Sequence, residues 1–310
     1  MKKTPVCQAL ALLFIINSVN LFSQDYIKFG KFDEKYFAAE KCDFDTSAHA
    51  FFIFNEQTCI FDYHQTTVIY DANGMMTQGT DYRNNIHIHR AIKILEDDAA
   101  GQWGDFVYPY NPKYDEISSV KGITYNMENG KVVKSKLEKN QIVYEKISPS
   151  RENLKLNMPN VKKGSILELE INIASDDFYS LGPWLLQNMI PIEKNIVVFK
   201  RPNYYNYNRI FKGYYGVTPK FSQAKRDIQI TLKTSDAMSR ETQMRTLSYD
   251  EYTEEYNMDK VPAFPMESHL STPYNYLASI MFELSFTDFS GSTRKSFNTS
   301  WEAVNNQLLE

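Results

Sequence analysis

The chain has 310 residues, of which 43% are hydrophobic and 23% are charged. This balance is too apolar for a disordered chain and is typical of a folded protein with two domains or one large β-domain. The net charge of −4 at pH 7 offers no basic surface for a nucleic-acid backbone, so no nucleic-acid partner is expected.

Residues 1–23 have the pattern of a signal peptide. Lys2 and Lys3 precede an apolar stretch at residues 9–16 that is too short to span a bilayer. We expect cleavage after Ser23, or alternatively after Gln24; an uncleaved membrane anchor is the competing interpretation. No other stretch has the length and apolar character of a membrane span. The sequence therefore predicts an exported protein, periplasmic or secreted, with no membrane span after cleavage.

Residues 24–47 form a lead-in segment, with a short helix expected around residues 34–41. From residue 48 onward apolar and polar residues mostly alternate, as in strands with one buried face. Strands are expected at residues 51–54, 60–70, 86–95, 106–110, 117–127, 131–136, 141–147, 166–173, 196–200, 227–233 and 276–286. Asn129 and Gly130 separate two of these strands and are a strong hairpin signal.

The order of these elements shows no alternation of strands with helices, which argues against a parallel α/β fold. It predicts a mainly β fold: a large, two-layer antiparallel β-sandwich over residues 48–295, with few helices. A break near residues 235–265 would divide the sandwich into two sub-parts. Residues 296–310 are expected to form a short C-terminal linker helix, because Trp301, Val304 and Leu308 recur at helical spacing.

Five segments in a shared order carry a resemblance to a known family: residues 89–95, 158–165, 184–191, 260–267 and 300–305. Together they resemble the uncharacterised β-sandwich domain that precedes transglutaminase-like domains in exported bacterial proteins, over about residues 60–310. The resemblance implies a papain-like catalytic domain with a Cys-His-Asp triad after the C-terminal helix. That domain would lie beyond Glu310, so its catalytic residues have no counterparts here. We therefore expect no enzyme activity, and a non-catalytic accessory or interaction module.

Cys42 and Cys59 are the only cysteines outside the signal peptide. In an oxidising compartment they could form a disulfide, and two buried free thiols are the equal alternative. A Cys/His hydrolase is a distant third function. Neither cysteine lies at a helix N-terminus or in a glycine-rich turn, where a nucleophilic thiol is usually activated.

His87 and His89 are two residues apart on an expected strand, so both side chains project from the same face. They are weak candidates for metal ligands, because two ligands are too few for a closed site, and a polar strand face is the favoured explanation. Nucleotide-binding and zinc-protease motifs are absent from the sequence. We therefore predict no metal and no other cofactor.

A cluster of tyrosines is the most unusual local composition. Its members are Tyr204, Tyr205, Tyr207, Tyr214 and Tyr215. Exposed tyrosines stack on sugar rings or peptides, so this cluster suggests a binding platform; packing at an edge of the sandwich is the alternative. A carbohydrate- or peptide-binding module is accordingly the second functional hypothesis, and the expected partner is an unidentified protein or glycan.

Overall fold

The computed structural model describes residues 27–31, 33, 35–70, 75–79, 81–234, 242–266, 272–289 and 294–297. Over these residues the chain forms seventeen strands and two short α-helices, which confirms the expected mainly β fold. The strands are β1 (Ala50–Gln65), β2 (Thr67–Tyr70), β3 (Met76–Gln78), β4 (Asp81–Ile94), β5 (Asp105–Tyr110), β6 (Asp115–Glu128), β7 (Lys131–Lys136), β8 (Ile142–Ser148), β9 (Arg151–Asn157), β10 (Ile166–Ser175), β11 (Ser180–Leu185), β12 (Ile192–Pro202), β13 (Tyr205–Lys212), β14 (Lys220–Thr234), β15 (Thr242–Val261), β16 (Ser279–Thr287) and β17 (Lys295–Ser296). The helices are α1 (Lys35–Ala38) and α2 (Asp97–Trp103), with 3₁₀ turns η1 (Lys139–Gln141) and η2 (Pro273–Asn275).

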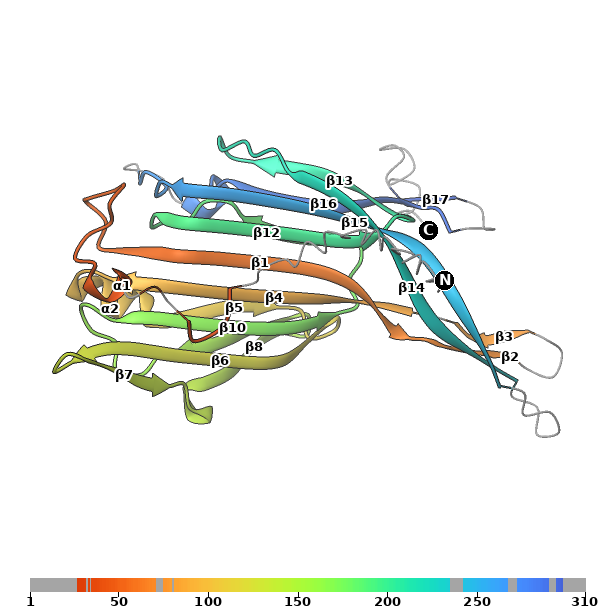
Figure 1. The fold of residues 1–310 in the computed structure, drawn as a ribbon, viewed down its shortest axis with the longest axis horizontal. Helices are drawn as coiled ribbons and strands as arrows, with labels where there is room; N and C mark the ends of the chain where they lie inside the picture. The colour runs from red at the N-terminus through yellow and green to blue at the C-terminus, as the bar shows by residue number, and fades with distance from the viewer. Residues whose placement is uncertain are drawn as a thin grey trace, which may run out of the picture.

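Ten strands form one large twisted sheet (Figure 1). Their order is β3-β2-β14-β15-β12-β1-β4-β10-β6-β7. Neighbouring strands are antiparallel except in two pairs, β1–β12 and β2–β14, which are parallel. Figure 1 shows β14 and β15 crossing the other strands obliquely and extending, together with β2 and β3, beyond their ends.

The strand β1 lies near the middle of this sheet, between β4 and β12. All ten residues from Ala50 to Cys59 are buried, although four consecutive ones, residues 55–58, are polar. Buried polar side chains need hydrogen-bond partners inside the protein. Asn55 has one in Asn195 of β12, whose Oδ1 accepts from Asn55 Nδ2 at 2.7 Å. The charged member of this stretch, Glu56, belongs to the site described below.

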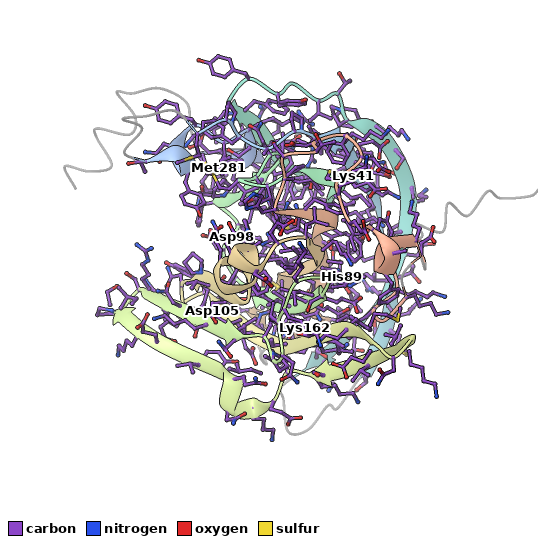
Figure 2. All side chains as sticks on the ribbon, turned by 90° about the vertical axis from the view of Figure 1, so that its left-hand side faces the viewer. Lys41, His89, Asp98, Asp105, Lys162 and Met281 are labelled. Carbon is purple, nitrogen blue, oxygen red and sulfur yellow. The ribbon has the colours of Figure 1, made fainter. Side chains whose placement is uncertain are left out.

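Two smaller sheets pack against one face of the large sheet and form the second layer of the sandwich. One contains β11, β16 and β13, with β17 beside β16; the other contains β5, β9 and β8. Phe199 of the large sheet stacks on Phe282 of β16, with ring centroids 4.2 Å apart. Leu169 and Ile171 of β10 share a buried cluster with Leu154 of β9. In Figure 2, Met281 of β16 and Asp105 of β5 both lie to the left of His89, consistent with both small sheets covering the same side.

The lead-in segment covers the opposite face of the large sheet at one end. Phe37 and Phe44 pack on a buried cluster that includes Phe51 and Ile53 of β1 and Ile166 of β10. The short helix expected in this segment is present as α1. At this end of the sheet, residues that precede the first strand therefore cover a face that would otherwise be open to solvent.

The hairpin between β6 and β7 forms at the predicted turn. Asn129 and Gly130 both have positive φ, 50° and 72°, as a two-residue hairpin turn requires. Glycine accepts this conformation without strain, and asparagine tolerates it better than most residues. The sequence signal and the backbone geometry agree at this position.

The signal peptide expected at residues 1–23 and the helix expected at residues 296–310 lie outside the described residues, apart from Ser296 in β17 and Phe297. β15 is continuous from Thr242 to Val261, across most of the interval suggested for an internal break, and residues 235–241 lie outside the described part. Within the described part, no helix has the length and apolar character needed to cross a membrane.

Candidate functional site

Three ionisable side chains form a row across the middle of the large sheet. Glu56 of β1, His89 of β4 and Glu170 of β10 are paired directly opposite one another in the two strand registers. Directly opposed residues point to the same face of a sheet. That face is the one on which the lead-in segment packs, so the row lies beneath and beside this segment.

His89 and Glu168 form a fully buried pair within this region, each with 0% of its side chain exposed. His89 Nε2 lies 2.9 Å from Glu168 Oε1 (His89 is labelled in Figure 2). Glu168 also accepts the Tyr125 hydroxyl at 2.6 Å and the Gly30 backbone N–H, which is 2.9 Å from each of its oxygens. The carboxylate thus ties β10 to β4, to β6 and to the lead-in segment. Burial, followed by the nearby Glu168 carboxylate, raises the pKa of Tyr125 and keeps it a hydrogen-bond donor.

Since a carboxylate accepts hydrogen bonds, Nε2 of His89 is assigned as the N–H that faces Glu168, and in the tautomer with one ring proton the lone pair lies on Nδ1. Nδ1 is buried and has no hydrogen-bond partner among the described residues. Glu56 Oε2, 4.0 Å away, is equally buried and unpartnered. Burial raises the pKa of Glu56, although His89 and the Ile27 backbone act in the opposite direction. The His89 ring is held edge-on to Phe54, with ring centroids 4.7 Å apart.

His87 and Glu170 lie beside His89 at the rim, where solvent reaches the site. His87 Nε2 is 3.4 Å from Glu170 Oε2, and Lys121 Nζ is 2.6 Å from Glu170 Oε1. Burial lowers the pKa of His87 and favours its neutral form. The nearby Glu170 carboxylate raises this pKa, but its effect is smaller than that of burial. Burial raises the pKa of Glu170, but Lys121 and His87 together hold it below its ordinary value.

One ligating atom from each of His87, His89 and Glu170 lies within 4.8 Å of the other two. The expectation that the two histidines share a face is confirmed, since their ring centroids are 5.9 Å apart. The sequence pattern predicted a strand at residues 166–173, which contains Glu168 and Glu170, but did not show that this strand pairs with the histidine strand. A third candidate ligand was therefore missed, along with the buried carboxylate that orients His89.

The two cysteines are both buried free thiols, and they belong to different clusters of buried side chains. Of the two alternatives left open by the sequence, the structure has the free thiols and not the disulfide. Burial raises the pKa of both Cys42 and Cys59, which disfavours the nucleophilic thiolate.

The tyrosine cluster does not form the exposed platform that the composition suggested. Tyr207 is 6% exposed in the core of the second layer, and its hydroxyl donates to the Phe178 carbonyl at 2.8 Å. Tyr204 and Tyr205 pack among other aromatic rings; the Tyr204 hydroxyl is hydrogen-bonded to that of Tyr82. These three fill space between the two layers, as the packing alternative proposed.

Tyr214 and Tyr215 differ from the other three tyrosines. Tyr214 is 99% exposed and Tyr215 is 37% exposed, in the irregular stretch after β13. Only these two of the five tyrosines have exposed rings, so the five residues do not form one surface. Local composition shows that aromatic side chains are present but not which side of the sheet they occupy.

A second surface lies on β7, at the edge of the large sheet. Met127, Val132 and Val133 on the β6–β7 hairpin are 47%, 39% and 41% exposed, and Lys131 and Lys136 beside them are also exposed. A hollow of about 660 Å³ between this hairpin and the lead-in segment is lined by apolar and basic side chains, including Phe37, Met127, Val132 and Lys134. Among the strands that the structure describes, β7 pairs only with β6, so its outer edge is unpaired.

Comparison with known proteins gives a family and a structural likeness. A family model described as "Domain of Unknown Function with solved-structure structure (DUF3857)" matches residues 80–257, an interval that contains His87, His89, Glu170 and the whole β6–β7 hairpin. The crystal structure of a "putative protease" from Parabacteroides distasonis ATCC 8503 is similar at 12% sequence identity and a TM-score of 0.49. The likeness covers 77% of this chain and 41% of that chain, so this chain spans less than half of its length. No curated protein matches the sequence.

Proposed function

This chain belongs to the DUF3857 family, and from that premise we propose that it is an exported, non-catalytic module that acts by binding a partner protein along the edge strand β7. The observation that carries the proposal is the unpaired edge of β7, which has exposed apolar and basic side chains and lies next to a lined hollow. An unpaired strand edge offers backbone N–H and C=O groups to an extended segment of another chain.

The charge of the β7 edge favours one kind of partner segment. Lys131, Lys134 and Lys136 are exposed along the six residues of β7. Two copies of this edge would bring lysines together, and like charges across a strand pair are destabilising. An extended segment with acidic residues is attracted instead, and its apolar residues can contact Val132 and Met127 at the hollow. The proposed partner is therefore a different protein with an acidic, strand-forming segment.

The signal-peptide pattern of residues 1–23 supports export, so the proposed encounter is outside the cytoplasm. The resemblance of five ordered segments to the domain that precedes transglutaminase-like enzymes supports an accessory role. The raised pKa values of Cys42 and Cys59 give no support to cysteine catalysis by this chain.

Site-specific photo-crosslinking in the native cells tests the proposal. A photoreactive residue placed at Val133 should give one discrete protein adduct. The same residue at Val143, 51% exposed on β8 in a different sheet, is the matched control and should give none. Charge reversal by Lys131→Glu together with Lys136→Glu should remove most of the Val133 adduct, because the attraction to an acidic segment is lost.

Equal adducts from both positions, or no adduct from either, would contradict the proposed surface. An adduct that persists after charge reversal would contradict the acidic chemistry of the partner. Mass determination of the exported chain tests the export step separately, and a chain that retains Lys2 and Lys3 would contradict it.

A further inference from the structure

We propose that His87, His89 and Glu170 form a binding site for a divalent transition-metal ion, with zinc as the best-suited ion. The three ligands come from adjacent strands, β4 and β10, and lie on the face beside the lead-in segment. The inference is independent of the proposed partner surface, because these residues are not on β7.

The pair at the rim has the spacing of metal ligands. His87 Nε2 and Glu170 Oε2 are 3.4 Å apart. Two ligands about 2.1 Å from a tetrahedral ion are themselves about 3.4 Å apart. Both side chains are partly exposed, at 23% and 13%, so an ion can enter from solvent and keep water in its remaining positions.

The third ligand, His89, is held in place by Glu168 and Phe54, and in this proposal it binds the ion through Nδ1. Glu168 holds its Nε2–H, an arrangement in which a carboxylate orients a metal-binding histidine from behind. Its Nδ1 and the facing Glu56 Oε2 are both buried acceptors without a partner in the described structure. A proton between them would not satisfy both, since 4.0 Å is too long for a hydrogen bond. A bound cation would stabilise these closely spaced, unpaired acceptor atoms.

The types of ligand atom indicate which class of ion the site would bind. Two imidazoles and one carboxylate suit zinc, and also cobalt and nickel, whereas magnesium and calcium prefer sites made only of oxygen. Lys121 is the competing cation: its ammonium contacts the Glu170 oxygen that does not face His87. Because the Lys121 side chain is 56% exposed, it can move away when an ion binds.

Titration of the mature, tag-free chain with Co²⁺, followed by its visible absorption, and with Zn²⁺ in competition is the direct test. We expect one equivalent to bind, with an absorption spectrum typical of a mixed nitrogen and oxygen ligand set. Zn²⁺ should raise the melting temperature, since it binds only the folded state. His87→Ala and Glu170→Gln should each weaken binding by about tenfold or more. These rim positions are chosen because substitution of the buried His89 would disturb folding.

Two further variants separate ligation from a general effect on the fold. Lys121→Met should bind the ion more tightly, because the competing positive charge is removed; a purely structural role for Glu170 would not produce this gain. His64→Ala, at an exposed histidine elsewhere on β1, should leave binding unchanged. Absence of binding to the wild-type chain, or binding that survives both His87→Ala and Glu170→Gln, would overturn the proposal.

Discussion

At the scale of single residues, Lys93 is a buried lysine whose ammonium group is hydrogen-bonded to backbone carbonyls. It lies in β4, is 1% exposed, and its ammonium donates to the carbonyl oxygens of Gly164 at 2.8 Å and Phe37 at 3.3 Å. Burial lowers its pKa to about 8, from an ordinary value of 10.5. Keeping Lys93 charged therefore costs free energy in the folded protein but not in the unfolded chain.

This cost predicts a particular dependence of stability on pH. Between about pH 8 and pH 10.5 the unfolded chain keeps the Lys93 proton that the folded chain has released. The free energy of unfolding therefore increases as the pH rises through this range. Lys93→Met lacks this gain. Relative to the variant, the wild type should become more stable by about 3 kcal/mol between pH 7 and pH 10.5.

Urea unfolding of the two proteins across this pH range measures the difference, and the exposed Lys212→Met is the control. A constant difference between wild type and Lys93→Met would show that Lys93 does not titrate differently in the folded state.

At the scale of elements, the lead-in segment is attached to the sheet through one buried carboxylate. Gly30 has a φ of +84°, a conformation that few residues other than glycine adopt, and its backbone N–H reaches both oxygens of Glu168. Tyr36 adds a contact at the other end, where its hydroxyl donates to Glu193 at 2.9 Å. The segment therefore depends on polar contacts as well as on the apolar packing of Phe37 and Phe44.

Glu168→Gln should loosen this segment while leaving the sheet folded. The substitution removes a buried charge that accepts from Gly30, Tyr125 and His89, which should cost about 2–4 kcal/mol. Exposed lysines at positions 28, 31, 35 and 41 are trypsin sites within the segment, so limited trypsinolysis measures how often it detaches.

Glu170→Gln is the matched control on the same strand. Because Glu170 is partly exposed and its hydrogen bond is to Lys121 and not to the backbone of the segment, this variant should be cleaved at nearly the wild-type rate. Equal cleavage of the two variants would mean that Glu168 does not hold the lead-in segment.

At the scale of the whole molecule, local patterns of the sequence predicted many of the strands but not their partners, and they missed β9, β11, β13 and β15. Alternation between Ile86 and Leu95 and the Asn129-Gly130 turn indicated elements whose geometry depends on neighbouring residues. The order of ten strands, and the parallel pairing of β1 with β12, depend on contacts between distant parts of the chain. Periodicity does not encode such contacts.

The same limit explains what was found and missed in the candidate site. Two histidines separated by one residue are visible in the sequence, and their common face follows from strand geometry. Glu170 and Glu168 join them only because β10 pairs with β4 in one register. Burial of Tyr207 depends likewise on which layer covers its strand.

The central claim is that the edge of β7 is the surface on which this family member binds its partner. Hydrogen exchange of the chain, alone and with the protein that the Val133 adduct identifies added in free form, tests that claim most directly. We expect the backbone amides of Lys131–Lys136 to exchange more slowly in the complex, while those of β8 stay unchanged. Slower exchange confined to the stretch around Tyr214 and Tyr215, with β7 unaffected, would contradict the account.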